Sequence, residues 1–212
     1  MLRRTRDACE TAVVSAVLDV SKPTPLRLFG FLFTAAGGLL IALASIQTWA
    51  TVGIVDDRRG VLDTVIPGVD RVDGMATLAM GVVMLIALVA LRIVGSTGAR
   101  RALALLILAC AAASLVIGIL DASDVSGRFE DTGAERIIET VSRERDVPID
   151  EVRRQYEAVG SDVIDFTPGI GLWLVIAGGA VGLVGGLLDL AWVGQQRLQA
   201  ADVDNADADL RV

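Results

Sequence analysis

Four long stretches of this chain are made of apolar and small residues and contain no charged side chain: residues 28–50, 74–91, 102–120 and 166–188. A helix rises about 1.5 Å per residue, so each stretch reaches roughly across the hydrocarbon core of a bilayer. Because a backbone in lipid must satisfy its own hydrogen bonds, each stretch is predicted to be a transmembrane helix. We place the four spans at about residues 28–50, 74–94, 102–121 and 166–190.

The fold class predicted from this pattern is all-α, a four-helix transmembrane bundle over residues 28–194. The chain is 53% hydrophobic, and its charged residues lie almost entirely outside the four stretches. Its net charge of −7 argues against a nucleic acid as partner, since phosphate binding needs clustered cations. Histidine is absent, which removes the commonest metal ligand and proton carrier.

Tryptophan side chains mark the ends of two spans. Trp49 closes the first, Trp173 lies near the start of the last, and Trp192 follows its end. Tryptophan is enriched where the membrane meets water, so all three are predicted to lie at a membrane interface. Chance placement of three tryptophans is the alternative.

Positive charge predicts the orientation. The connection between the second and third spans carries Arg92, Arg100 and Arg101 and no acid, and the N-terminal segment is also basic. By the positive-inside rule, both segments and both termini are expected in the cytoplasm of a multi-pass cell-membrane protein. Cleavage of a secretory signal after the Ala42-Leu43-Ala44 motif would leave three spans, but the apolar run is longer than the ~7–15 residues typical of such signals.

The segments outside the membrane differ in character. Residues 1–27 form the N-terminal segment, in which residues 5–20 have the spacing of an amphipathic helix at the membrane surface, and a short helix that is disordered part of the time is the alternative. The first outer loop, 51–73, is predicted to be irregular or partly extended, and the second, 122–167, to be a small extracytoplasmic helical hairpin. Thr132 has capping-box spacing for its first helix, and Pro148 can start its second. The acidic tail, 195–212, is predicted to be disordered.

Small residues in the spans predict close helix packing. Three glycines in the fourth span are spaced four residues apart, and the first span offers a matching strip. Such strips let helices approach closely in lipid, and packing within one bundle is favoured over dimerisation. The predicted packing residues are Gly30, Gly38, Gly178, Gly182 and Gly186.

No catalytic, cofactor or metal motif stands out, so no catalytic residue, cofactor or metal ligand is predicted. The five aspartates of residues 51–73 fit no calcium-loop spacing, and a solvated acidic surface explains them better than a cation site. Charged residues lie only at the ends of the spans, as Arg27, Arg92, Asp121 and Asp189 do, which counts against a transporter or pump. The sequence therefore favours a non-enzymatic role over an enzymatic one.

The overall layout resembles small uncharacterised four-span membrane proteins of high-GC prokaryotes. The resemblance rests on the Trp-ended first span, the Gly-Val-Asp70-x-x-Asp73-Gly74 entry to the second, the Gly-Arg128-Phe129 segment and the Pro168-Gly-Ile-Gly-Leu-Trp173 entry to the fourth. It implies a four-span fold and no particular activity.

The sequence favours a structural or protein-interaction role in the cell membrane. The expected partners are membrane lipids, other membrane or envelope proteins, and a second copy of the chain. An oligomeric channel or small-molecule exporter is the first alternative, and a lipid-acting enzyme using arginines of the second outer loop is the other.

Overall fold

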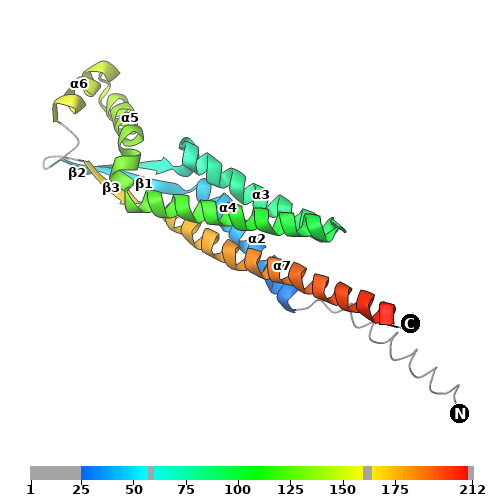
Figure 1. Ribbon diagram of the computed structural model, residues 1–212. Coiled ribbons are helices and arrows are strands. Elements are labelled where there is room, and N and C mark those ends of the chain that lie inside the picture. The colour runs from blue at the N-terminus through cyan, green and yellow to red at the C-terminus, as the bar shows by residue number, and fades with distance from the viewer. Residues whose placement is uncertain (1–24, 57–59, 160–163, 210–212) are drawn as a thin grey trace, which may run out of the picture.

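The computed structural model describes residues 25–56, 60–159 and 164–209 (Figure 1). The amphipathic helix expected within residues 1–27 lies almost wholly outside the described residues. Within the described part, the chain is mostly helical, with one small antiparallel sheet at one end of the bundle. We call this the sheet end, and the other the opposite end.

Four helices are long and apolar enough to cross a membrane, as the sequence predicts. They are α2 (Pro25–Ser45), α3 (Val72–Ile93), α4 (Thr97–Ser123) and α7 (Ile170–Asp209), whose apolar part ends at Gln196. Helix α7 packs along α2 and α4, and α3 packs on the other side of the same two helices. The chain is therefore a multi-pass membrane protein built on a four-helix bundle.

The first and last spans are shorter at the sheet end than predicted. Helix α2 ends at Ser45, and strand β1 (Thr48–Asp56) takes up Trp49 and Ala50, because β-branched and aromatic residues favour extended backbone. Helix α7 begins at Ile170, because residues 164–168 form strand β3 (Ile164–Pro168).

The predicted all-α fold class is incomplete, because the protein also contains a three-stranded sheet. The strand order is β2-β1-β3, and all neighbours are antiparallel. Strand β1 pairs with β2 (Gly60–Pro67) through contacts such as Val52 opposite Thr64. It also pairs with β3, where Val52 lies opposite Phe166. The sheet joins two loops that are far apart in sequence, and a pattern within either loop alone does not reveal their pairing.

The predicted helical hairpin is present but starts earlier. Helix α5 (Val125–Arg145) begins after Asp124, whose side chain accepts a hydrogen bond from the backbone N–H of Gly127, so the capping box expected at Thr132 is wrong. Helix α6 (Ile149–Val159) follows Pro148 as predicted. Ile137 of α5 is buried. We call α5 and α6 the arm.

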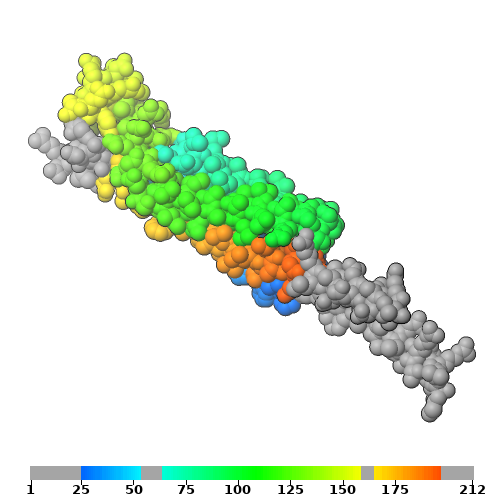
Figure 2. Space-filling model, in the orientation of Figure 1, coloured from blue at the N-terminus to red at the C-terminus, as the bar shows by residue number. Residues whose placement is uncertain are grey.

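The arm is held against the sheet by α5. Helix α5 contacts all three strands, and a Cβ added at Gly133 would lie 2.6 Å from Phe166 and 3.3 Å from Val52. Helix α6 packs mainly on α5 through the buried Val152. In Figure 2 the arm, in yellow-green, extends past the end of the long body formed by the membrane helices.

The tail predicted to be disordered is instead helical as far as Asp209, where α7 ends. Extending an existing helix adds one hydrogen bond per ordered residue, and the tail is rich in alanine, a strong helix former. Figure 1 shows this part of α7 continuing beyond the other membrane helices.

The glycines singled out for helix packing lie at helix contacts. A Cβ added at Gly178 would lie 2.9 Å from that of Leu40 on α2, and one at Gly182 would lie 2.7 Å from Met84 on α3. The corresponding neighbours are Leu85 for Gly38, Leu108 for Gly186 and Asp189 for Gly30. A side chain at Gly178 would press on the Cβ of Leu40 and the backbone of Ile41 and push α2 and α7 apart, whereas at Gly182 the nearest atom is the end of the flexible Met84 side chain, which can move.

Candidate functional site

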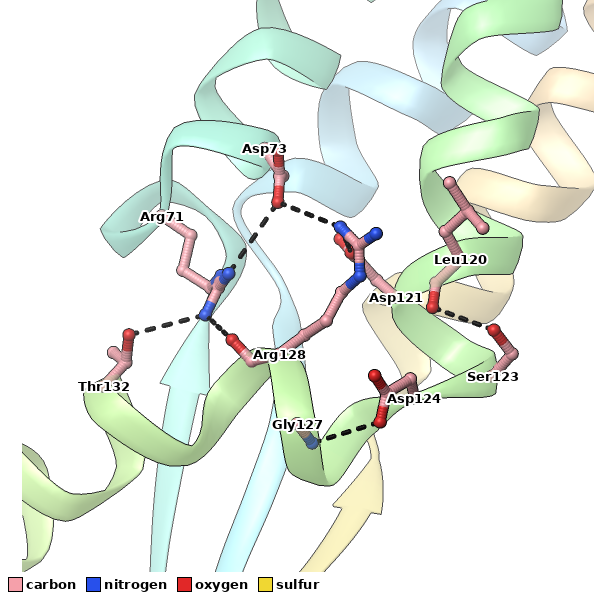
Figure 3. Close-up of polar contacts among 9 residues, drawn as sticks. All are labelled: Arg71, Asp73, Leu120, Asp121, Ser123, Asp124, Gly127, Arg128 and Thr132. Carbon is pink, nitrogen blue, oxygen red and sulfur yellow. Dashed lines mark hydrogen bonds and ion pairs between the residues drawn. The ribbon is translucent and has the colours of Figure 1, made fainter.

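Two buried aspartates, one at each end of the bundle, organise the polar contacts of the protein. The first is Asp121 in the last turn of α4, whose side chain is fully buried. Arg128, in the first turn of α5, places its Nη1 3.1 Å from Asp121 Oδ1 and 3.9 Å from Oδ2 of Asp73 (Figure 3). The connection between α4 and α5 is only one residue, Asp124, so the two helices hold these side chains close together.

Arg71 completes this sheet-end network, which we define as Arg71, Asp73, Asp121 and Arg128. Its guanidinium lies 4.4 Å from the centre of the Phe129 ring and 3.7 Å from Asp73, and donates a hydrogen bond to the backbone carbonyl of Arg128 (Figure 3). The network contains two arginines and two aspartates. Its charge is balanced, and it joins the start of α3, the end of α4 and the start of α5.

A polar hollow of about 350 Å³ lies beside the network. Its lining includes Asp70 and Arg136, which form an ion pair, and the carboxylates of Glu135 and Glu139. Of the aspartates considered for a cation site, Asp70 and Asp73 are ion-paired. Within the described residues no cluster of three or more His, Cys, Asp or Glu could hold a metal ion.

On the arm, Tyr156 faces the acidic side of α5. Burial raises the pKa of its hydroxyl above the ordinary value, and the carboxylates of Glu130 and Asp131 add to the shift. The side chain is half-buried.

Trp49 fills the junction between bundle and sheet. Its side chain is fully buried, and its Nε1 donates a 3.0 Å hydrogen bond to the carbonyl of Ala44. Gly68 contacts the indole so closely that no side chain would fit there. The sheet is thereby attached to the last turn of α2.

The second buried aspartate is Asp189 on α7, at the opposite end. Its side chain is fully buried, and its Oδ2 accepts a 3.1 Å hydrogen bond from the hydroxyl of Thr34 on α2. Arg92, in the last turn of α3, donates from Nη2 to Asp189 Oδ1 at 2.9 Å. Gly30 makes room for this carboxylate, since a Cβ there would lie 2.8 Å from Oδ1.

Three arginines surround Trp192, one turn further along α7. The guanidinium carbons of Arg27, Arg92 and Arg100 lie 5.3, 5.2 and 5.6 Å from the centre of its ring. Arg100 also donates to the carbonyl of Val94 at 2.7 Å and to Gln196 at 2.8 Å. We call Arg27, Arg92, Arg100, Asp189 and Trp192 the opposite-end cluster.

Sequence reasoning treated Asp121, Asp189 and Arg92 as charges that end the spans, and did not predict that they are buried and paired. One signal was present: the apolar pattern resumes after Asp189 with Leu190, Ala191 and Trp192, as it does inside a helix that packs against others.

The three tryptophans differ in their surroundings. Trp173 on α7 is 54% exposed, as expected of a residue that faces lipid headgroups, whereas Trp49 and Trp192 are buried by protein. That all three tryptophans lie at the membrane–water interface stays a prediction.

Comparison with known proteins identifies a family. The model of the Tryptophan-associated transmembrane protein family matches residues 31–203, which is more than half of the chain and includes all three strands and both buried aspartates. No curated protein matches the chain.

Proposed function

The chain belongs to the Tryptophan-associated transmembrane protein family, and we propose that it is a non-enzymatic scaffold of the cell membrane whose arm binds another membrane or envelope protein. The observation that carries this proposal is the sheet-end network. It ties the first turn of α5 to α3 and α4, so the arm has a fixed direction relative to the membrane helices.

The surface of the arm favours a protein partner. Residues 122–167 contain twelve acidic residues and six arginines, and most of those on α6 are exposed, including Asp150, Glu151 and Glu157. The apolar side of the arm is already occupied, because Ile137, Ile138 and Val152 are buried. A surface of this sign attracts a basic partner and orients it by charge complementarity.

The orientation belongs to the same proposal. Arg27, Arg92 and Arg100 lie together at the opposite end, and basic residues near span ends are retained on the cytoplasmic side. We therefore place both termini in the cytoplasm and the arm outside it.

Labelling of single cysteines tests the orientation. Cys9 and Cys110 are first replaced by serine, and a cysteine is introduced by Gln155→Cys on α6 or Gly98→Cys near the start of α4, both exposed. In intact cells a membrane-impermeant maleimide is expected to label the Gln155→Cys variant and to label the Gly98→Cys variant only after permeabilisation. The reverse pattern would show that the arm is cytoplasmic.

Photocrosslinking tests the partner. A photoreactive residue at Gln155 is expected to give one discrete protein adduct in native membranes. The same residue at Ile86, which is 63% exposed on α3 and faces lipid, serves as the control and should not give that adduct. The double variant Asp150→Lys and Glu151→Lys should abolish it without lowering the amount of chain in the membrane. If the adduct persists in that variant, the acidic surface is not the binding surface.

A small-molecule exporter remains the second candidate, and the buried charges favour it. Ionisable groups inside membrane helices often line transport paths, and Asp121 and Asp189 are both fully buried. The family description links its members to tryptophan, so tryptophan is the first solute to test. Export would be supported if proteoliposomes with the wild type take up radiolabelled tryptophan and proteoliposomes with Asp189→Asn do not. It would be excluded if proteoliposomes with the wild type take up no more tryptophan than protein-free liposomes.

A further inference from the structure

Among the side chains that the structure describes, positive charge is in excess at the opposite end. Three guanidiniums lie within 5.6 Å of the centre of one indole ring, whereas Asp189 is the one carboxylate paired with them among residues 25–56, 60–159 and 164–196. Cation–π contacts with Trp192 attract each arginine but do not neutralise it. Like charges held this close repel one another, and a bound anion would remove the repulsion.

Arg92 has hydrogen-bonding capacity that the described protein leaves unused. Its Nη2 donates to Asp189 and, at 3.4 Å, to the carbonyl of Arg27, but its Nε and Nη1 are buried and have no partner. A guanidinium carries five N–H donors, and buried donors without partners are costly. Because Nε and Nη1 are buried, a phosphate oxygen reaches them once the Arg92 side chain turns toward the surface, and arginine then binds phosphate through two N–H groups at once.

A groove opens beside the side chain of Arg92. It has a volume of about 340 Å³ and is lined by Arg27, Leu28, Phe31 and Arg92. Arg27 is exposed, and Leu28 and Phe31 are 49% and 39% exposed on the lipid-facing side of α2. The groove is therefore mostly apolar and is bordered by two arginine side chains, next to the lipid-facing side of α2.

We propose that this groove binds an anionic phospholipid. The phosphodiester lies between Arg27 and Arg92, and an acyl chain runs along Leu28 and Phe31. The apolar wall selects a lipid over a soluble phosphate, since a free anion gains nothing from contact with leucine and phenylalanine. Basic pockets between membrane helices are a known mode of headgroup binding. The site does not depend on the protein partner proposed for the arm or on the orientation of the chain.

Native mass spectrometry of the full-length chain in an uncharged detergent tests the site. Phosphatidylglycerol is titrated against the wild type and against Arg27→Gln, which removes a charge from the groove without touching Asp189. Because one basic residue near a membrane surface contributes about 1 kcal/mol, lipid affinity is expected to fall about fivefold. Arg101→Gln removes the same charge at the same end from a different groove, and should change the affinity less than about twofold. Arg27→Lys should restore most of the loss.

Further ligands separate the lipid from other anions. Phosphatidylcholine, whose headgroup has no net charge, should bind more weakly than phosphatidylglycerol, and Phe31→Ala should weaken binding of the anionic lipid. Millimolar inorganic phosphate should not displace the bound lipid. Equal affinity for the two lipids, equal effects of Arg27→Gln and Arg101→Gln, or displacement by free phosphate would each overturn the proposal.

Discussion

The two ends of the bundle each bury one aspartate against an arginine, but they balance its charge differently. At the sheet end, Asp121 and Asp73 match Arg128 and Arg71, and Arg128 is 38% exposed. At the opposite end, Asp189 faces Arg92, whose side chain is only 16% exposed, with two more arginines around the same tryptophan. The sheet-end network is balanced in charge and partly open to solvent, although Asp121 Oδ2 and Arg71 Nε are buried there without a hydrogen-bond partner among the described residues. The opposite-end cluster instead carries surplus positive charge.

This difference separates a structural joint from a binding site. A balanced network has no net charge for an outside ion to neutralise, which suits it to hold α3, α4 and α5 together and to orient the arm. A network with surplus positive charge gains stability from an external anion. The arm is therefore the part we expect to bind protein, and the opposite-end groove the part we expect to bind lipid.

Asp189→Asn should have the largest effect. The change keeps the size of the side chain but leaves Arg92 buried without a counter-charge, and breaking a buried ion pair costs about 3–5 kcal/mol. In a chain of this size the melting temperature should fall by about 10 °C. Thermal unfolding in an uncharged maltoside detergent measures it, and a change as small as that of Asp121→Asn would remove the contrast between the two ends.

Gly30→Ala should have an intermediate effect, and Gly127→Ala is its matched control. In both, the new Cβ would lie 2.8 Å from an aspartate oxygen, Asp189 Oδ1 for the first and Asp124 Oδ1 for the second. Asp189 is buried and held by two partners, whereas Asp124 is exposed and can move away. Overpacking at Gly30 is expected to cost about 2 kcal/mol.

At Gly127 the gain in helix propensity should offset the contact to within about 0.5 kcal/mol. The same melting experiment compares both variants. Equal losses of stability in the Gly30→Ala and Gly127→Ala variants would mean that Asp189 can move away from the new Cβ as easily as the exposed Asp124 can.

Asp121→Asn should cost less, about 1 kcal/mol, although Asp121 is as fully buried as Asp189. Arg128 keeps a second carboxylate, Asp73, at 3.9 Å and remains open to water. The variant should also leave the orientation of the arm unchanged, measured as an unaltered distance between spin labels at Gln155 and Ile86. A loss near that of Asp189→Asn would show that the sheet-end network tolerates no missing charge.

The four spans were predictable because each is a long uncharged stretch, and lipid allows few backbone structures other than a helix. The sheet was not, because Val52 pairs with Phe166 across more than a hundred residues of sequence, and neither loop reveals its partner. The helix α5 was predicted from the capping-box spacing at Thr132, and its start was therefore misplaced, since Asp124 also suits a cap.

The two networks could be predicted only in part. Arg92 and Asp189 were visible as span ends, but their pairing depends on the packing of α3 against the far end of α7. The orientation of the chain in the membrane was predicted from the density of basic residues in its loops. The contact of Arg27, Arg92 and Arg100 with Trp192 is a tertiary contact, and no rule of sequence spacing predicts it.

The smallest effect on stability is expected from Trp173→Phe, which nevertheless tests how each end meets the membrane. Trp173 is 54% exposed at the sheet end, whereas Trp192 is 7% exposed beneath the arginines and Trp49 is fully buried. Brominated lipids quench only indoles that they touch, so Trp173 should account for most of the quenching in wild-type proteoliposomes. The Trp173→Phe variant should lose that quenching and melt as the wild type does, because an exposed aromatic side chain contributes little to packing. Strong quenching that survives the substitution would place lipid against the indole of Trp192 or Trp49 itself, beyond the proposed contact along Leu28 and Phe31, and would mean that protein does not shield these two indoles.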